Sequence, residues 1–330
     1  LAYNPALVVN AHQPAAAPPT ARLLDAEAFA AAVATMHSAE RCHEHAAQQL
    51  SATTIQLGGE RQPVGVRQLR VAHQHTSERC GHHAFFNALC AAEALAAPSA
   101  ADASAALADT QSEAAFWARF AQSSASLLAE GEKRGSGTWP WEPQMMRSGE
   151  VERTHMSHLL RAPDVGRLGG SEVFMVFQYA FGRSQLDADS LGACQAAADA
   201  FVASRSAHRC VIVGALSHWV TIVFSKAEPG ALDVLLLDSH NRPVLGLDAA
   251  GLEAAADARA EERGWDPASS KREYYHRHLC DLTAVIELLT KIFAGVTDLR
   301  AEAVDGAVSR LLEDWRTAVG GKDGAEAAAA

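Results

Sequence analysis

The sequence lacks several features that would place it in a class of proteins at once. It has no basic excess, because its formal net charge is -11, and a general nucleic-acid binder needs a basic face. No apolar run approaches the length that spans a bilayer. The first residues, LAYNPALVVNAHQPAAAPP, lack the basic start and long apolar core of a signal peptide. We therefore expect an intracellular protein, cytoplasmic or nuclear, without a nucleic-acid partner or membrane association.

The cysteines also lack the short paired spacing of a disulfide framework or a zinc site. They are scattered over 330 residues and comprise Cys42, Cys80, Cys90, Cys194, Cys210 and Cys280. In a chain of this length without a signal peptide, such spacing indicates reduced thiols.

Internal repeats are absent as well, and the order of elements predicts an α+β fold with segregated halves. Helical periodicity dominates early, β-rich runs follow from 172 to 237, and helical periodicity returns after 250. We expect one domain over 21–318, with a helical part at 21–165, a sheet part at 170–245 and C-terminal helices at 250–318. The Ala-rich and Pro-rich ends, 1–20 and 319–330, are predicted to be disordered.

One stretch that is present, QHTSERCGHHAFFNALCAAEAL at 74–95, joins a Cys-Gly pair to an apolar helical pattern. The pattern places one stripe for burial on a helix that starts near Cys80. A thiol at a helix N-terminus lies at the positive end of the helix dipole, and its backbone N–H can donate to an oxyanion. Gln74, six residues earlier, can supply a second donor, and Gly81 allows a substrate close to the backbone.

A hairpin supplies the other groups that a nucleophilic thiol needs. In SHWVTIVFSKAEPGALDVLLLDSHN, residues 217–241, two apolar runs flank a turn signal. A turn centred near Glu228 and Pro229 places His218 opposite Ser239 and Asp238 opposite Trp219, and a slip of one residue can place His218 directly across from Asp238. An imidazole next to a thiol populates the thiolate, and a carboxylate on the other ring nitrogen orients the imidazole. Asn241 is an alternative orienting residue, and Asp238 is preferred on register.

These motifs, in the order Gln74, Cys80-Gly81, His218 and Asp238, resemble those of the papain-like cysteine peptidase superfamily. CGHHAFFNAL is similar to the nucleophile helices of deubiquitinating enzymes and phytochelatin synthases. SHWVTIVF with LLLDS resembles segments of ubiquitin-like-modifier proteases, which place His and Asp before Cys, whereas here Cys comes first. The matches cover about 74–95 and 211–241.

The resemblance implies a papain-like fold, in which a helical half carrying the nucleophile packs on an antiparallel sheet half, with C-terminal helices. It implies a cysteine protease that needs no cofactor and cleaves a peptide or isopeptide bond, with ubiquitin or a ubiquitin-like protein as partner. Such modifiers end in Gly-Gly, so the cleft near Cys80 should be narrow, walled by 73–78 and by Trp139 or Trp141. Trp219 lies on the opposite face of its strand from His218, and substrate contact and core packing both remain open for it.

Three alternatives stay open. The first is a phytochelatin-synthase-like transpeptidase that acts on glutathione, and the second is an inactive interaction protein. The third is a zinc site in HQHTSERCGHH, with ligands among His73, His75, Cys80, His82 and His83, and with CHEH at 42–45 as the only similar cluster. We expect no metal, because Gln74 and the hairpin pair would then be coincidences.

Overall fold

The computed structural model describes residues 25, 27–33, 53–57, 60–74, 79–133, 156, 158–159, 172–175, 177–180, 183–186, 188–205, 207–215, 218–226, 232–241 and 249–295. The predicted disordered ends, the CHEH cluster and the part of the expected C-terminal helices beyond 295 lie outside these ranges. Trp139 and Trp141 also lie outside them. No helix in the described part combines the length and apolar character needed to cross a bilayer.

Within the described residues, six strands form one sheet in the order β1-β2-β8-β7-β6-β3. Two shorter strands, β4 and β5, pair separately as an antiparallel ribbon. The sheet strands are β1 (Thr53–Leu57), β2 (Glu60–Leu69), β3 (Glu172–Met175), β6 (His208–Ala215), β7 (His218–Lys226) and β8 (Leu232–Leu237); the ribbon strands are β4 (Phe177–Ala180) and β5 (Arg183–Leu186).

The sheet is mixed, which corrects the expected antiparallel half. β6, β7 and β8 are antiparallel neighbours, but β2 runs parallel to β8 and β3 runs parallel to β6. The β-rich stretch 172–180 is divided between β3 in the main sheet and β4 in the ribbon. The fold is α+β, as predicted, but two of its sheet strands come before the helix that starts at Cys80.

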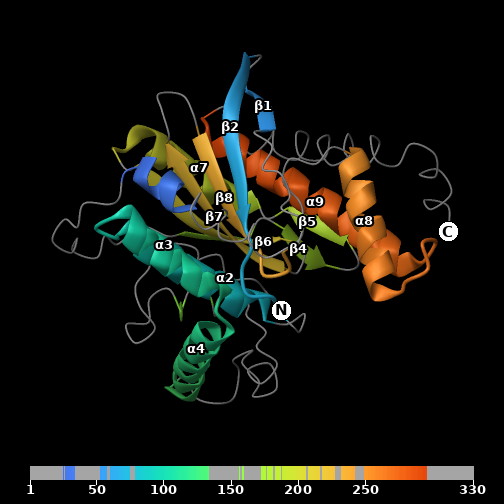
Figure 1. Ribbon diagram of the computed structural model, residues 1–330, viewed down its shortest axis with the longest axis horizontal. Helices are drawn as coiled ribbons and strands as arrows, with labels where there is room; N and C mark the ends of the chain where they lie inside the picture. The colour runs from blue at the N-terminus through green and yellow to red at the C-terminus, as the bar shows by residue number, and fades with distance from the viewer. Residues whose placement is uncertain are drawn as a thin grey trace.

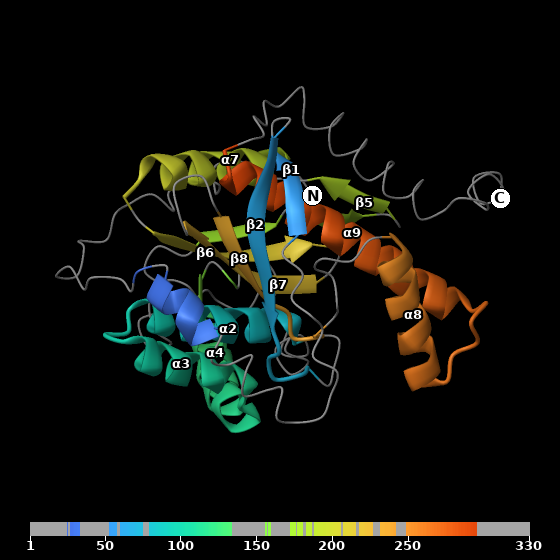
Figure 2. The same ribbon diagram turned by 45° about the horizontal axis from the view of Figure 1, so that its top comes forward.

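Helices cover both faces of the sheet, so the expected segregation into a helical half and a sheet half is wrong (Figures 1 and 2). One apolar cluster joins a face of the sheet to α7, α8 and α9, and the other joins the opposite face to α2, α3 and α4. The helices are α2 (Cys80–Leu95), α3 (Ala100–Ala108), α4 (Glu113–Lys133), α7 (Ala188–Ala203), α8 (Ala249–Arg263) and α9 (Ser270–Phe293).

Burial of β7 on both faces explains this layering. All its residues from His218 to Ser225 are buried, and near-continuous apolar strands are typical of sheets covered on both sides. On the α9 face, the rings of Phe224 and Phe293 stack with centroids 4.2 Å apart. On the α2 face, the hydroxyl of Thr221 donates to the carbonyl oxygen of Ala84 at 2.6 Å. Together these contacts hold α2 and α9 on opposite sides of one strand.

The β7–β8 hairpin has a register one residue away from the expected one. Thr221 pairs with Leu237, and the same register continued past the ladder places His218 opposite His240 and Asp238 opposite Val220. Two residues directly opposite each other on neighbouring strands point to the same face of the sheet. Every second residue along a strand also points to that face. His218 and Asp238 therefore point to the same face as diagonal neighbours, whereas the expected register would have separated them.

Candidate functional site

The end of the β7–β8 hairpin brings an imidazole and a carboxylate into contact. His218 begins β7 and Asp238 directly follows β8, and His218 Nε2 lies 2.7 Å from Asp238 Oδ1. The side chains are 4% and 0% exposed respectively. A hydrogen bond this well shielded from water holds the ring orientation, and because a carboxylate accepts hydrogen bonds, Nε2–H is the donor toward it.

A tight turn over 238–241 holds the carboxylate in place. The backbone N–H of His240 donates to Asp238 Oδ1 at 3.0 Å, and that of Asn241 donates to the carbonyl oxygen of Asp238 at 2.7 Å. Asn241 has φ of 50°, in the left-handed region that Asn tolerates better than most residues. Its side-chain amide binds both the N–H and the C=O of Val71, at 2.9 and 2.8 Å. The structure thus makes Asp238 the partner of His218, and Asn241 anchors the turn to the segment after β2.

Gln74 belongs to the same assembly. Its backbone N–H donates to the carbonyl oxygen of Ser239 at 2.9 Å, and its side-chain Oε1 accepts a hydrogen bond from Ser239 Oγ at 2.5 Å. Gln74 is 2% exposed. Because Oε1 is turned toward Ser239, the Nε2 donor end of the amide is turned the other way. The predicted oxyanion donor is therefore held rigidly beside the His218–Asp238 turn.

Cys80 is the first residue of α2, as the sequence predicted, and it is buried. The first intrahelical bond runs from the His83 N–H to the Arg79 carbonyl at 3.0 Å, so the N–H groups of Cys80 and Gly81 precede the helical ladder. No acidic residue lies in the first turn to oppose the helix dipole. A matched contrast is Cys90 on the same helix, where burial, with smaller contributions from Glu93 and Asp109, raises the thiol pKa to about 12.

The Thr221–Ala84 bond joins β7 to α2. Ala84 lies one helical turn after Cys80, and Thr221 lies three residues after His218. Cys80 and Trp219 belong to one apolar cluster between α2 and the sheet. These contacts hold α2 against β7.

Trp219 packs in the core, which is one of the two roles left open for it. Its side chain lies against Gly214 on the neighbouring strand, so close that a Cβ atom added there would lie 3.0 Å from the ring. It is 6% exposed, on the α2 face of the sheet. Gly81 is likewise buried, in the first turn of α2. The expected wall residues Trp139 and Trp141 lie outside the described residues, so their role stays a prediction.

A small pocket lies beside the N-terminus of α2. Trp117, on α4, is 40% exposed, and the Arg79 guanidinium sits 4.7 Å from the centroid of its ring. The pocket is lined by His73, Arg79, His83, Glu113, Phe116 and Trp117. Two of its walls therefore come from the residue before Cys80 and from the residue before Gln74.

The histidines that follow Cys80 contact protein groups on α4. His82 Nδ1 lies 2.8 Å from Ser123 Oγ, and the His83 ring stacks on Phe116 with centroids 3.6 Å apart. Among the described residues, no three or more His, Cys, Asp or Glu side chains are grouped so as to hold a metal ion. His75, Cys42, His43 and His45 lie outside the described ranges.

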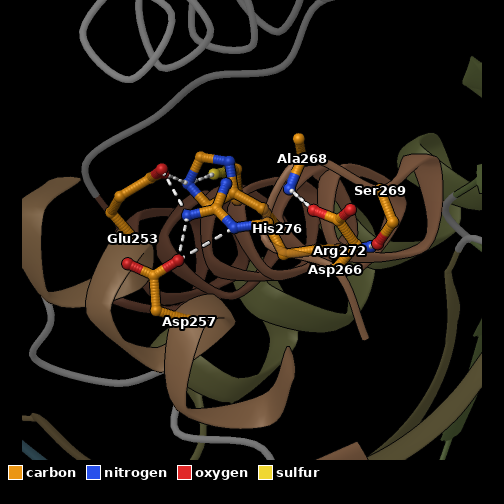
Figure 3. A network of polar contacts seen from close by, with 8 residues as sticks. Glu253, Asp257, Asp266, Ala268, Ser269, Arg272 and His276 are labelled. Atoms are coloured by element: carbon orange, nitrogen blue, oxygen red, sulfur yellow. Dashed lines mark hydrogen bonds and ion pairs between the residues drawn. The ribbon is translucent and has the colours of Figure 1, made fainter. Parts of the chain in front are cut away.

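A second place where Cys, His and carboxylate meet lies between α8 and α9 (Figure 3). His276 Nε2 is 2.8 Å from Glu253 Oε2 and 3.7 Å from Cys280 Sγ. Arg272 binds both Glu253 and Asp257 at 2.5 and 2.7 Å. Burial, the largest influence, lowers the pKa of His276, and the Glu253 carboxylate only partly offsets it. The described part of the chain contains five cysteines, all of them buried and none in a disulfide.

Comparisons with protein-family models, with curated proteins and with solved structures found no match.

The sequence reasoning missed the groups that hold the turn, namely Ser239 and His240. Two further rings lie near that of His218. The centroid of the His240 ring is 4.7 Å from it, and that of His278, on α9, is 6.3 Å from it. The signal for His240 was present in LLLDSHN. A hairpin register shifted by one residue places this histidine directly opposite His218.

Proposed function

We propose that this protein is a papain-like cysteine hydrolase with a Cys80-His218-Asp238 mechanism. The observation that carries the proposal is the buried 2.7 Å bond between His218 and Asp238, in a hairpin that Thr221 ties to the helix beginning with Cys80. The order and roles are those of the superfamily that the motifs resemble. An imidazole–carboxylate pair that reaches a helix-terminal thiol activates the sulfur as a nucleophile, and this contact is part of the proposal.

The proposed mechanism gives the two ring nitrogens of His218 different roles. Since Nε2–H donates to Asp238, Nδ1 of His218 takes the proton from the Cys80 thiol. The thiolate then attacks the substrate carbonyl carbon, and a C–S bond forms as the carbonyl oxygen gains negative charge. His218 Nδ1–H returns the proton to the leaving amine as the C–N bond breaks. Water, deprotonated by the same nitrogen, then hydrolyses the thioester and releases the thiol.

Two donors stabilise the negative oxygen in this proposal. One is the backbone N–H of Cys80, which precedes the helical ladder of α2, and the other is Nε2 of Gln74. Because Ser239 and the Gln74 backbone are joined by two hydrogen bonds, the amide needs little reorganisation when charge develops. Gln74 thus has the rigidity that an oxyanion donor requires.

The substrate we propose is the C-terminal tail of ubiquitin or a ubiquitin-like modifier. The His-Trp and Asp-Ser segments resemble those of modifier proteases, and the net charge of -11 suits a basic partner surface. Trp219 supports the site from the core rather than from the cleft.

The experiment is to incubate the protein with ubiquitin and related modifiers that carry a C-terminal alkyne, and to measure adducts by intact mass. A single adduct that is lost in Cys80→Ala and kept in Cys280→Ala supports the proposal. Release of glycine from glutathione without any modifier adduct assigns the protein to the transpeptidase class. Neither reaction, together with equal alkylation of all native cysteines, identifies an inactive interaction protein.

A further inference from the structure

His240 lies at the centre of the turn that carries Asp238, and it contacts the proposed catalytic pair in two ways. Its backbone N–H donates to Asp238 Oδ1 at 3.0 Å, the same oxygen that accepts from His218. Its ring lies over the His218 ring, with centroids 4.7 Å apart and planes tilted by 34°. One residue therefore touches both members of the pair.

The backbone of His240 has little freedom, because both of its neighbours are fixed to the segment after β2. Ser239 exchanges hydrogen bonds with Gln74, and the Asn241 amide binds the backbone of Val71. The ring also has a neighbour on its far side, since His73 approaches it edge-on with centroids 6.0 Å apart. The hydrogen bonds of the turn and the contact with His73 therefore determine where the ring of His240 lies.

Two histidine rings, those of His240 and His278, lie against the imidazole of His218. His240 overlaps one side of the imidazole, while His278 of α9 meets it edge-on at 6.3 Å. His240 itself is only half-buried, so it borders solvent, whereas His218 and Asp238 are buried. Excluding water strengthens a hydrogen bond between an imidazole and a carboxylate, because water competes for both partners.

We propose that His240 is a positioning residue for His218, an inference that rests on the proposed function. Its N–H holds the Asp238 carboxylate, and its ring keeps water from the Nε2–Oδ1 bond and limits rotation of the imidazole. This role depends on the size and planar shape of the side chain, which keep water from the Nε2–Oδ1 bond. Phe at this position keeps both, whereas Ala loses both and leaves the backbone N–H in place.

The test compares His240→Ala with His240→Phe in the full chain by proton NMR. The proton between His218 and Asp238 gives a downfield resonance, assigned by its loss in His218→Gln. We expect the resonance to stay sharp in His240→Phe and to broaden through water exchange in His240→Ala. Because a small misplacement of a reacting group can cost about a hundredfold, we expect kcat to fall roughly ten- to hundredfold in His240→Ala, with KM nearly unchanged.

Two results would overturn the inference. One is a resonance and kcat in His240→Ala equal to those of the parent protein. The other is equal loss in His240→Phe and His240→Ala, since coverage by the ring would then not be the cause. The NMR comparison needs no substrate and can be made on Cys80→Ala. It therefore decides the role of His240 even if Cys80 proves unreactive, and an active Cys80 with an unchanged resonance would reject this inference alone.

Discussion

The chain combines Cys, His and carboxylate in two regions, and the two are built differently. At the end of the β7–β8 hairpin, Asp238 is 0% exposed and its Oδ1 lies 2.7 Å from His218 Nε2. Between α8 and α9, Glu253 is 46% exposed and binds Arg272 as well as His276. The first carboxylate is buried against its histidine, whereas the second belongs to a partly solvated network that joins two helices.

The ring nitrogens separate the two regions further. A histidine that relays a proton needs one nitrogen for the carboxylate and the other for the nucleophile. In the α8–α9 network, Nε2 of His276 contacts both Glu253 and Cys280, so it cannot fill both roles. Cys280 also lies in the middle of α9, whereas Cys80 begins α2. The same residue types thus make a helix clamp in one place and a candidate catalytic centre in the other.

The largest expected effect is on the thiols themselves. Cys80→Ala should abolish turnover and remove the fastest iodoacetamide labelling at pH 6 to 7, because that thiol is the proposed nucleophile. Cys280→Ala should leave both unchanged, and Cys90, whose pKa is raised to about 12 by burial, should resist labelling. Peptide mapping after short labelling times measures this. Equal labelling of the native cysteines would remove the distinction between the two regions.

The carboxylates should differ nearly as much. Asp238→Ala should reduce kcat by about a hundredfold or more, since His218 loses the acceptor that orients it. Asp238→Asn keeps an accepting oxygen and should recover much of the rate. Glu253→Gln should leave kcat unchanged and cost about 1 kcal/mol or less in unfolding free energy, as expected for an exposed pair. Steady-state kinetics measure kcat, and denaturant melts measure the unfolding free energy. Full activity in both Asp238 variants would contradict the predicted role of this carboxylate.

A smaller effect is expected at Gln74, and it sharpens the division of roles within the site. Loss of one oxyanion donor typically lowers kcat about a hundred- to a thousandfold, which we expect for Gln74→Ala. Labelling of Cys80 should persist, because the amide acts on the transition state and not on the thiolate. Ser239→Ala, which removes only the support of Gln74, should lose less. Gln74 would be structural if Gln74→Ala slowed labelling as much as His218→Ala.

The smallest effect concerns pH and the helix clamp. Burial lowers the folded-state pKa of His276 below its ordinary value of 6.5, so the unfolded chain takes up the proton more readily. Stability should therefore decrease as pH falls below about 6.5, and it should decrease less steeply in His276→Gln. Thermal melts between pH 7.5 and 5 measure the difference. A steeper dependence in the variant would show that the Glu253 pair outweighs burial.

Much of the site could be predicted from local patterns. The helix start at Cys80 and the three strands from 208 to 237 follow from periodicity and turn residues, and the spacing places His218 and Asp238 at the same end of one hairpin. The hairpin register was wrong by one residue, because it depends on turn geometry within 227–231, which composition does not determine. The position of His240 over His218 was missed for the same reason.

The layering could not be predicted from those patterns. Parallel pairing of Val64 with Leu232 joins residues far apart in the sequence, and no local period reports it. The apolar runs of β6, β7 and β8 were compatible with one covered face or two. Trp219 illustrates this ambiguity. Its position next to His218 left both substrate contact and core packing open, and the helices that cover its face of the sheet place it in the core.

The hydrogen bonds between Asn241 and Val71 also determine when the site can form during folding. It joins residues 170 positions apart, and the parallel β2–β8 pairing beside it spans a similar separation. Contacts with such long loops close slowly, because the chain loses much entropy before they form. A chain leaving the ribosome has Cys80 and its helix long before residue 241 emerges. The thiol should thus stay unreactive through most of synthesis and gain its partners only when the two distant segments meet.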